Sequence, residues 1–104
     1  EPSTMDREGQ MSTTALAIQR ATAAEFDVTL SDLRGSSRSR KFSAPRHMAM
    51  SLCKSLTGLS FAQIGGAFER DKTSVYQACL RFADRLTVDP DMAAARDRII
   101  RRLS

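Results

Sequence analysis

The sequence predicts an all-α fold: a compact helical domain of about five to six helices that contains a helix-turn-helix and a preceding basic loop. Apolar residues recur at three- and four-residue spacing along most of the chain, which is the periodicity of amphipathic helices. Strand signals are nearly absent, because no alternating apolar run is longer than Val28 to Leu30 and no Asn-Gly or Asp-Gly turn occurs. The length of 104 residues suits one domain, which we place at residues 12–104.

The first helix is expected over residues 12–26, beginning near residue 12 or 13. Thr29 and Asp32 have the spacing of a capping pair for one short turn over residues 30–33, which Gly35 would end. These signals predict a long helix followed by a short one.

The next segment, residues 35–44, is rich in Gly, Ser and Arg and has no apolar periodicity, so we expect a loop. Positive charge is concentrated around it. The whole chain has 16 Lys and Arg against 12 Asp and Glu, yet the stretch from Arg34 to Lys54 contains six basic residues and no acidic one. A local positive field of this kind favours a polyanionic partner.

Pro45 suits the first position of a second long helix, which Gly58 would end. Ser60 and Gln63 form a capping-box pattern for a short helix that runs through Phe68. The two helices are therefore expected to be almost contiguous.

A tight polar turn over residues 69–72 follows, and Asp71 is the predicted N-cap of a longer helix. A final helix is expected to open with Asp89 as its cap and Pro90 at its first position. The longer helix has an apolar side formed by Val75, Ala78, Cys79, Phe82 and Leu86.

Residues 60–86 thus have the layout of a helix-turn-helix, in which the second helix enters the major groove by its N-terminus. Thr73, Ser74 and Gln77 have hydrogen-bonding side chains suited to reading base edges, and Lys72 could reach a guanine or a phosphate. The alternative is that this helix pair only builds a core. In that case Thr73 and Ser74 are ordinary first-turn residues.

The basic loop strengthens the DNA-binding interpretation. Arginines on a small-residue loop, such as Arg38 and Arg40 with the neighbouring Lys41, can enter a narrow minor groove and pair with phosphates. Taken alone, such a run of charge also fits a solvated loop. Its position directly before a helix-turn-helix favours the functional interpretation.

Catalysis, metals and cofactors are not expected. The chain has one histidine and no Ser/His/Asp or Cys/His arrangement, and Cys53 and Cys79 lie singly within apolar helical patterns, as small core residues do. No apolar run is long enough for a membrane span, so we expect a cytoplasmic, nucleoid-associated protein without a membrane partner or small-molecule substrate. We interpret residues 1–11 as a flexible N-terminus, in which residues 1–4 are compatible with a tag remnant.

The stretch from residue 18 to residue 82 resembles the C-terminal DNA-binding domain of the bacterial replication initiator family DnaA. The matching residues occur in the family's order and are Asp32-Leu33, Pro45-Arg46-His47-Met48-Ala49-Met50, Leu59-Ser60, Ile64-Gly65, Ala67-Phe68, Arg70-Asp71, Thr73, Val75, Ala78 and Cys79.

The resemblance implies binding of duplex DNA at DnaA boxes, and it assigns roles by position. Arg38 matches the minor-groove arginine. Phosphate contacts are implied for Arg46, His47 and Lys54. Arg70 belongs to the signature turn, and base contacts are implied for Asp71, Lys72, Thr73, Ser74 and Gln77.

The chain also departs from the family pattern. Glu69 stands where the family has two glycines, so the turn is one residue shorter, while Lys72 replaces a histidine and His47 a common glutamine. No GxxxxGK[ST] phosphate loop occurs in these 104 residues, so the sequence is either an excised domain or a stand-alone relative.

The leading hypothesis is sequence-selective binding of double-stranded DNA at DnaA-box-like sites, in control of chromosome replication initiation or transcription. The alternative is a non-enzymatic adaptor that binds the replication initiator or its regulatory ATPase. The shortened, recharged turn and the lack of an ATPase motif in this sequence together motivate this alternative.

Overall fold

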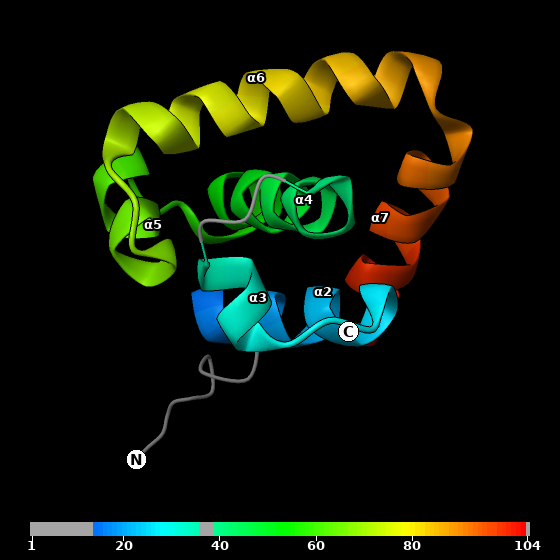
Figure 1. Cartoon of the computed structure of the whole chain (residues 1–104), viewed down its shortest axis with the longest axis horizontal. Coiled ribbons are helices and arrows are strands. Elements are labelled where there is room, and N and C mark those ends of the chain that lie inside the picture. Colours follow the sequence, from blue (N-terminus) through cyan, green and yellow to red (C-terminus); the bar gives the residue numbers. More distant parts are fainter. Residues whose placement is uncertain (1–13, 36–38, 104) are drawn as a thin grey trace.

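The computed structural model describes residues 14–35 and 39–103, and every regular element in these ranges is an α-helix. The predicted all-α fold is therefore confirmed. None of the helices in the described ranges combines the length and the apolar character needed to cross a bilayer. The helices, labelled as in Figure 1, are α2 (Ala15–Phe26), α3 (Leu30–Arg34), α4 (Arg40–Thr57), α5 (Phe61–Phe68), α6 (Lys72–Val88) and α7 (Pro90–Leu103).

Helix α4 lies at the centre of the molecule, and the other helices surround it (Figure 1). α6 crosses on one side of α4 and α2 lies on the opposite side, with α5 and α7 at the two ends. α4 packs against α6, α2, α3 and α5, while α7 closes the arrangement by packing against α2 and α6. Because α2, α3, α5 and α6 all pack against α4, its residues decide how these helices are positioned.

The helix starts follow the predicted capping signals. Thr29 and Asp32 form a reciprocal capping box at α3, and Ser60 and Gln63 form another at α5. The hydroxyl of Thr14 caps α2 by accepting from the Ala17 amide, a start slightly later than expected. Each cap satisfies backbone N–H groups that have no partner inside the helix.

Helix α4 begins earlier than predicted. Pro45 was expected at its first position, yet the helix starts at Arg40, because the Ser39 carbonyl already accepts the amides of Phe42 (3.0 Å) and Ser43 (2.9 Å). Proline is tolerated near a helix start, where few intrahelical N–H bonds are lost. The loop predicted over residues 35–44 is therefore wrong for its second half, which is the first turn of α4.

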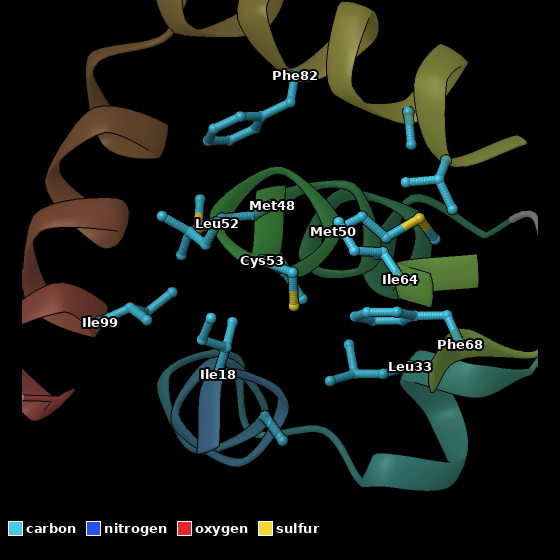
Figure 2. Close-up of a cluster of buried hydrophobic side chains, with 14 of the residues drawn as sticks. Ile18, Leu33, Met48, Met50, Leu52, Cys53, Ile64, Phe68, Phe82 and Ile99 are labelled. Atoms are coloured by element: carbon cyan, nitrogen blue, oxygen red, sulfur yellow. The ribbon is translucent and has the colours of Figure 1, made fainter. Parts of the chain in front are cut away.

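The core surrounds α4 and draws on every helix (Figure 2). Phe82 points toward α4 from α6, while Ile18 of α2 and Ile99 of α7 approach it from the other side. The ring of Phe68 lies against Leu33, which joins α5 to α3. The fully or almost fully buried apolar side chains include Ile18, Leu33, Met48, Met50, Leu52, Cys53, Ile64, Phe68, Val75, Phe82 and Ile99.

Cys53 is buried, as predicted, whereas Cys79 is only half-buried. Burial raises the pKa of the Cys53 thiol to about 12, and the nearby Cys79 adds to this shift. Cys53 is therefore a neutral core residue at physiological pH, which agrees with its predicted structural role.

Candidate nucleic-acid interface

Helices α5 and α6 meet at a tight turn. Glu69 ends α5 in the left-handed conformation with φ 59° and ψ 44°, and the Arg70 amide donates to the Gly65 carbonyl at 2.8 Å. A Cβ atom at Gly65 would lie 2.3 Å from the Arg70 carbonyl oxygen, so only glycine fits there. The shortened turn is thus accommodated by one close backbone approach and one left-handed residue.

Helix α6 opens with an exposed set of polar side chains, which we call the reading face: Lys72, Thr73, Ser74 and Gln77. Asp71 precedes it as the predicted N-cap, and its carboxylate accepts the Ser74 amide at 2.7 Å. Hydrogen bonds from Ser74 and then Thr73 hold the pKa of Asp71 below its usual value. The carboxylate is therefore charged at neutral pH, and its position at the start of α6 is fixed.

A groove runs between α4 and the start of α6. We call it the reading groove; its volume is about 290 Å³. It brings together seven of the predicted DNA-binding residues from two separate segments of the chain. The groove is lined by Arg46, His47, Met50, Arg70, Asp71, Thr73, Ser74, Gln77, Ala78 and Arg81.

Arg46 forms the buried base of this groove and is only 4% exposed. Its Nε donates to the Leu33 carbonyl at 2.9 Å, and its Nη2 donates to the Asp32 carbonyl at 2.8 Å. Burial lowers the pKa of Arg46, and the nearby Arg70 lowers it further. These two bonds fix the end of α3 on α4, so the structure gives Arg46 a positioning role.

Arg70 connects the helix-turn-helix to the segment before α4. Its guanidinium donates to the carbonyls of Arg34 (3.4 Å) and Phe68 (3.4 Å), and also to the carbonyl of Gly35. The point at which α3 ends is therefore held beside the turn between α5 and α6. Arg38 itself lies outside the described residues, so its predicted minor-groove contact stays a prediction.

Lys54 lies away from the reading groove, at the junction of α4 and α5. Its ammonium group donates to the Leu59 carbonyl at 3.2 Å and lies 4.6 Å from the centre of the Phe61 ring. The carbonyl contact and the cation–π contact together stabilise this junction. The predicted phosphate contact of Lys54 would have to form beside these interactions.

His47 is half-buried and lines both the reading groove and a second cavity. Burial lowers its pKa from the ordinary value of 6.5, and the charges of Arg81, Arg46, Arg85 and Arg70 lower it further. The imidazole is therefore neutral at pH 7 in the free protein.

The second cavity, which we call the basic cavity, has a volume of about 340 Å³. Two of its arginines, Arg81 and Arg85, were not among the predicted site residues. The signal was present, since Gln77, Arg81 and Arg85 follow one another at four-residue spacing on one side of α6. The basic cavity is lined by Arg40, Ser43, Ala44, His47, Arg81, Phe82 and Arg85.

Lys41 lies on the first turn of α4 with its ammonium group 5.6 Å from the centre of the Phe42 ring, and it lines neither cavity. Arg40, one residue earlier, lines the basic cavity. The structure therefore places Arg40, but not Lys41, beside α6. Within the described ranges, no group of three or more His, Cys, Asp or Glu residues could hold a metal ion.

A short capped helix, a tight turn, and a longer helix with an exposed polar N-terminus beside a basic groove define a helix-turn-helix domain of the DNA-binding class. The chain belongs to the family described as the bacterial DnaA protein helix-turn-helix, whose model matches residues 16–81.

Similar proteins include three chromosomal replication initiator proteins DnaA. The protein from Chromobacterium violaceum is 41% identical over 86 residues, which cover 82% of this chain and 18% of the relative. The protein from Laribacter hongkongensis is 42% identical over 77 residues, which cover 73% of this chain and 16% of the relative. The protein from Treponema denticola is 33% identical over 84 residues, which cover 80% of this chain and 18% of the relative. The present chain thus spans less than a fifth of each relative.

Proposed function

We propose that this domain binds double-stranded DNA sequence-selectively at sites related to DnaA boxes, and so acts in control of chromosome replication initiation or transcription. One observation carries the proposal: Thr73, Ser74 and Gln77 of the reading face border a single groove together with the basic residues Arg70 and Arg81. A duplex placed against this groove meets hydrogen-bonding groups for base edges and positive charge for phosphates at the same time.

The reading face supplies the sequence preference. The major groove is about 12 Å wide and admits the N-terminal turns of one helix. Thr73 and Ser74 offer hydroxyl groups, and Gln77, one turn further on, offers an amide that can pair with adenine. Lys72 stands where the family pattern has a histidine. We therefore expect the preferred DNA site to differ from the common DnaA box at the base that Lys72 faces.

Arginine-bearing segments supply the affinity. Arg70 holds the end of α3 against the turn beside the reading groove, and Arg40 begins α4 at the neighbouring basic cavity, so these two residues bracket the segment that contains Arg38. We propose that Arg38 enters the adjacent minor groove from this position. Each phosphate neutralised by such contacts contributes about 0.9 to the slope of log affinity against log salt.

Fluorescence anisotropy with a box duplex and a scrambled duplex tests the proposal. We expect the parent domain to prefer the box, and Thr73→Ala to reduce this preference by about 1–3 kcal/mol while leaving the salt slope unchanged. Arg38→Ala should instead flatten the slope by about 1. Equal binding of both duplexes by the parent at physiological salt would contradict sequence-selective binding.

A further inference from the structure

The basic cavity is separate from the reading face and lies further along α6. It is formed between the first two turns of α4, which carry Arg40 and His47, and the later turns of α6, which carry Arg81 and Arg85. None of its lining residues is acidic. The cavity is therefore a concentration of positive charge that base reading does not require.

The lining of the basic cavity matches the chemistry of a phosphate group. Guanidinium groups bind phosphate oxygens through paired N–H donors, and the Ser43 hydroxyl provides one further donor. Phe82, buried to 4% exposure, closes the inner wall and excludes water from one side. Arg85 also meets Asp89 at 3.6 Å on the next turn, where both side chains remain about one third exposed.

The distance along α6 separates this cavity from the base pairs. A helix rises 1.5 Å per residue, so Arg81 lies about 12 Å and Arg85 about 18 Å beyond Thr73. The major groove is only about 12 Å wide, so when the start of α6 faces the bases, Arg81 and Arg85 lie beyond the base edges, at the level of the phosphate backbone.

We infer that the basic cavity is a second phosphate site, which holds a backbone phosphate of the same duplex outside the base pairs that face Thr73, Ser74 and Gln77. This inference rests on the proposed DNA-binding function and extends it, because it makes affinity depend on DNA that flanks the recognised bases. Arg85 is its diagnostic residue, since it lines the basic cavity but not the reading groove.

The test compares a short box duplex with the same box carrying about six additional base pairs on each side, which adds about 20 Å of duplex per side at 3.4 Å per base pair. We expect the parent domain to bind the longer duplex roughly tenfold more tightly at about 50 mM salt, with a slope of log affinity against log salt steeper by about 0.9 for each added phosphate contact. Arg85→Gln should bind the short duplex like the parent and lose most of the gain from the flanks.

Arg101→Gln is the matched control, because it removes the same charge from an exposed position on the last turn of α7. That end of α7 lies beside α2, away from α6 (Figure 1). Arg101→Gln should keep the full gain in affinity that the parent shows for the longer duplex. Thermal unfolding of both variants checks that loss of the Arg85–Asp89 pair has not altered the fold.

Two results for Arg85→Gln would overturn the inference. In the first, the variant keeps the parent's gain in affinity for the longer duplex. In the second, the variant binds the short and the longer duplex more weakly than the parent by the same factor. A third arm titrates the parent with inorganic tripolyphosphate by calorimetry. Saturable binding that Arg85→Gln removes, together with no flank effect, would assign the cavity to a free polyphosphate instead. If box and scrambled short duplexes bind equally, the proposed function fails, while the flank comparison can still be read on either sequence.

Discussion

At the scale of single residues, four arginines around the two cavities form two pairs that differ in what their charged atoms contact. Arg46 and Arg70 donate to backbone carbonyls at the C-terminal end of α3. Arg40 and Arg81 are exposed and line cavities. Substitution of the first pair therefore changes how the interface is held together, while substitution of the second pair changes its charge.

Glu69 is the residue at which the shortened turn has an energetic cost. It adopts φ 59°, a conformation that costs a non-glycine residue about 1 kcal/mol or more. We expect Glu69→Gly to raise the free energy of unfolding by up to about 1 kcal/mol, measured by urea denaturation. The substitution also removes a negative charge beside the interface, so DNA affinity should rise at low salt. Glu69→Gln is the control, since it removes the charge but keeps the strain, and equal stability of the two variants would exclude the backbone explanation.

His47 should make DNA binding dependent on pH. In the free protein, burial and then Arg81, Arg46, Arg85 and Arg70 lower its pKa, whereas a bound phosphate favours the protonated ring. Complex formation therefore takes up a proton, and affinity should increase as pH falls from 7.5 toward 5.5, by at most about tenfold per pH unit for one proton.

The titration of His47 also affects the stability of the free protein, which should fall as pH falls, whereas DNA affinity should rise. Because the folded pKa of His47 lies below the unfolded value of 6.5, the unfolded chain is protonated first, and the free protein loses stability as pH falls through 6.5 until the folded state is also protonated. His47→Gln should flatten both profiles. The sequence contains no other histidine, so an unchanged affinity profile in this variant would remove His47 from the interface.

Sequence alone could identify the reading face but not the roles of the charged residues behind it. Thr73, Ser74 and Gln77 share a side of one helix, and that follows from helical periodicity. The burial of Arg46 and the contact of Lys54 with the Leu59 carbonyl depend on how separate helices pack, which no local pattern encodes. The four-residue spacing of Gln77, Arg81 and Arg85 places Arg85 on the same side of α6, but the cavity that it lines is formed jointly with α4 and was therefore not predictable.

At the scale of elements, the position of α5 depends on its capping box. The Ser60 hydroxyl accepts the Gln63 amide at 3.1 Å, and the Gln63 side chain accepts the Ser60 amide at 2.9 Å. We expect Ser60→Ala to lower the free energy of unfolding by about 1 kcal/mol, because a first-turn N–H loses its partner. Ser60→Asp, which can still accept this bond, should retain most of the stability in the same denaturation experiment. An equal loss in both variants would show that another contact of Ser60 is responsible.

Element boundaries were predictable where a side chain marks them. Asp71 and the Ser60–Gln63 pair are such marks, and so is Gly58, whose φ of 75° ends α4. The start of α4 at Arg40 was not predictable, because Pro45 is an equally good sign of a first helical position. Backbone bonds from the Ser39 carbonyl, rather than a capping side chain, begin this helix.

At the scale of the whole molecule, α7 closes the fold by joining the two ends of the described chain. Glu25 of α2 accepts from Arg98 at 2.5 Å and from Arg102 at 3.4 Å, both on α7. Ile99, between these two arginines in sequence, is fully buried in the core. The interface thus combines an apolar contact with an ion-pair network, and both act between helices that are distant in sequence.

The ion pairs of Glu25 with Arg98 and Arg102 should control the stability of the protein in acid, at pH values well below those at which His47 titrates. The hydrogen bond that Arg98 donates to Glu25, and to a lesser extent the charges of Arg98 and Arg102, hold the pKa of Glu25 below its ordinary value of 4.5. A carboxyl group with a lowered folded pKa contributes stability that is complete above the unfolded pKa and is lost as pH falls through the folded one. We therefore expect the melting temperature of the parent to fall steeply below about pH 4.5, and that of Glu25→Gln to be lower at pH 7 and less dependent on pH in this range. Asp84→Gln, at an exposed position on α6, is the comparison variant and should follow the parent profile. If Glu25→Gln follows it as well, the closure of the molecule rests on the apolar contact of Ile99 alone.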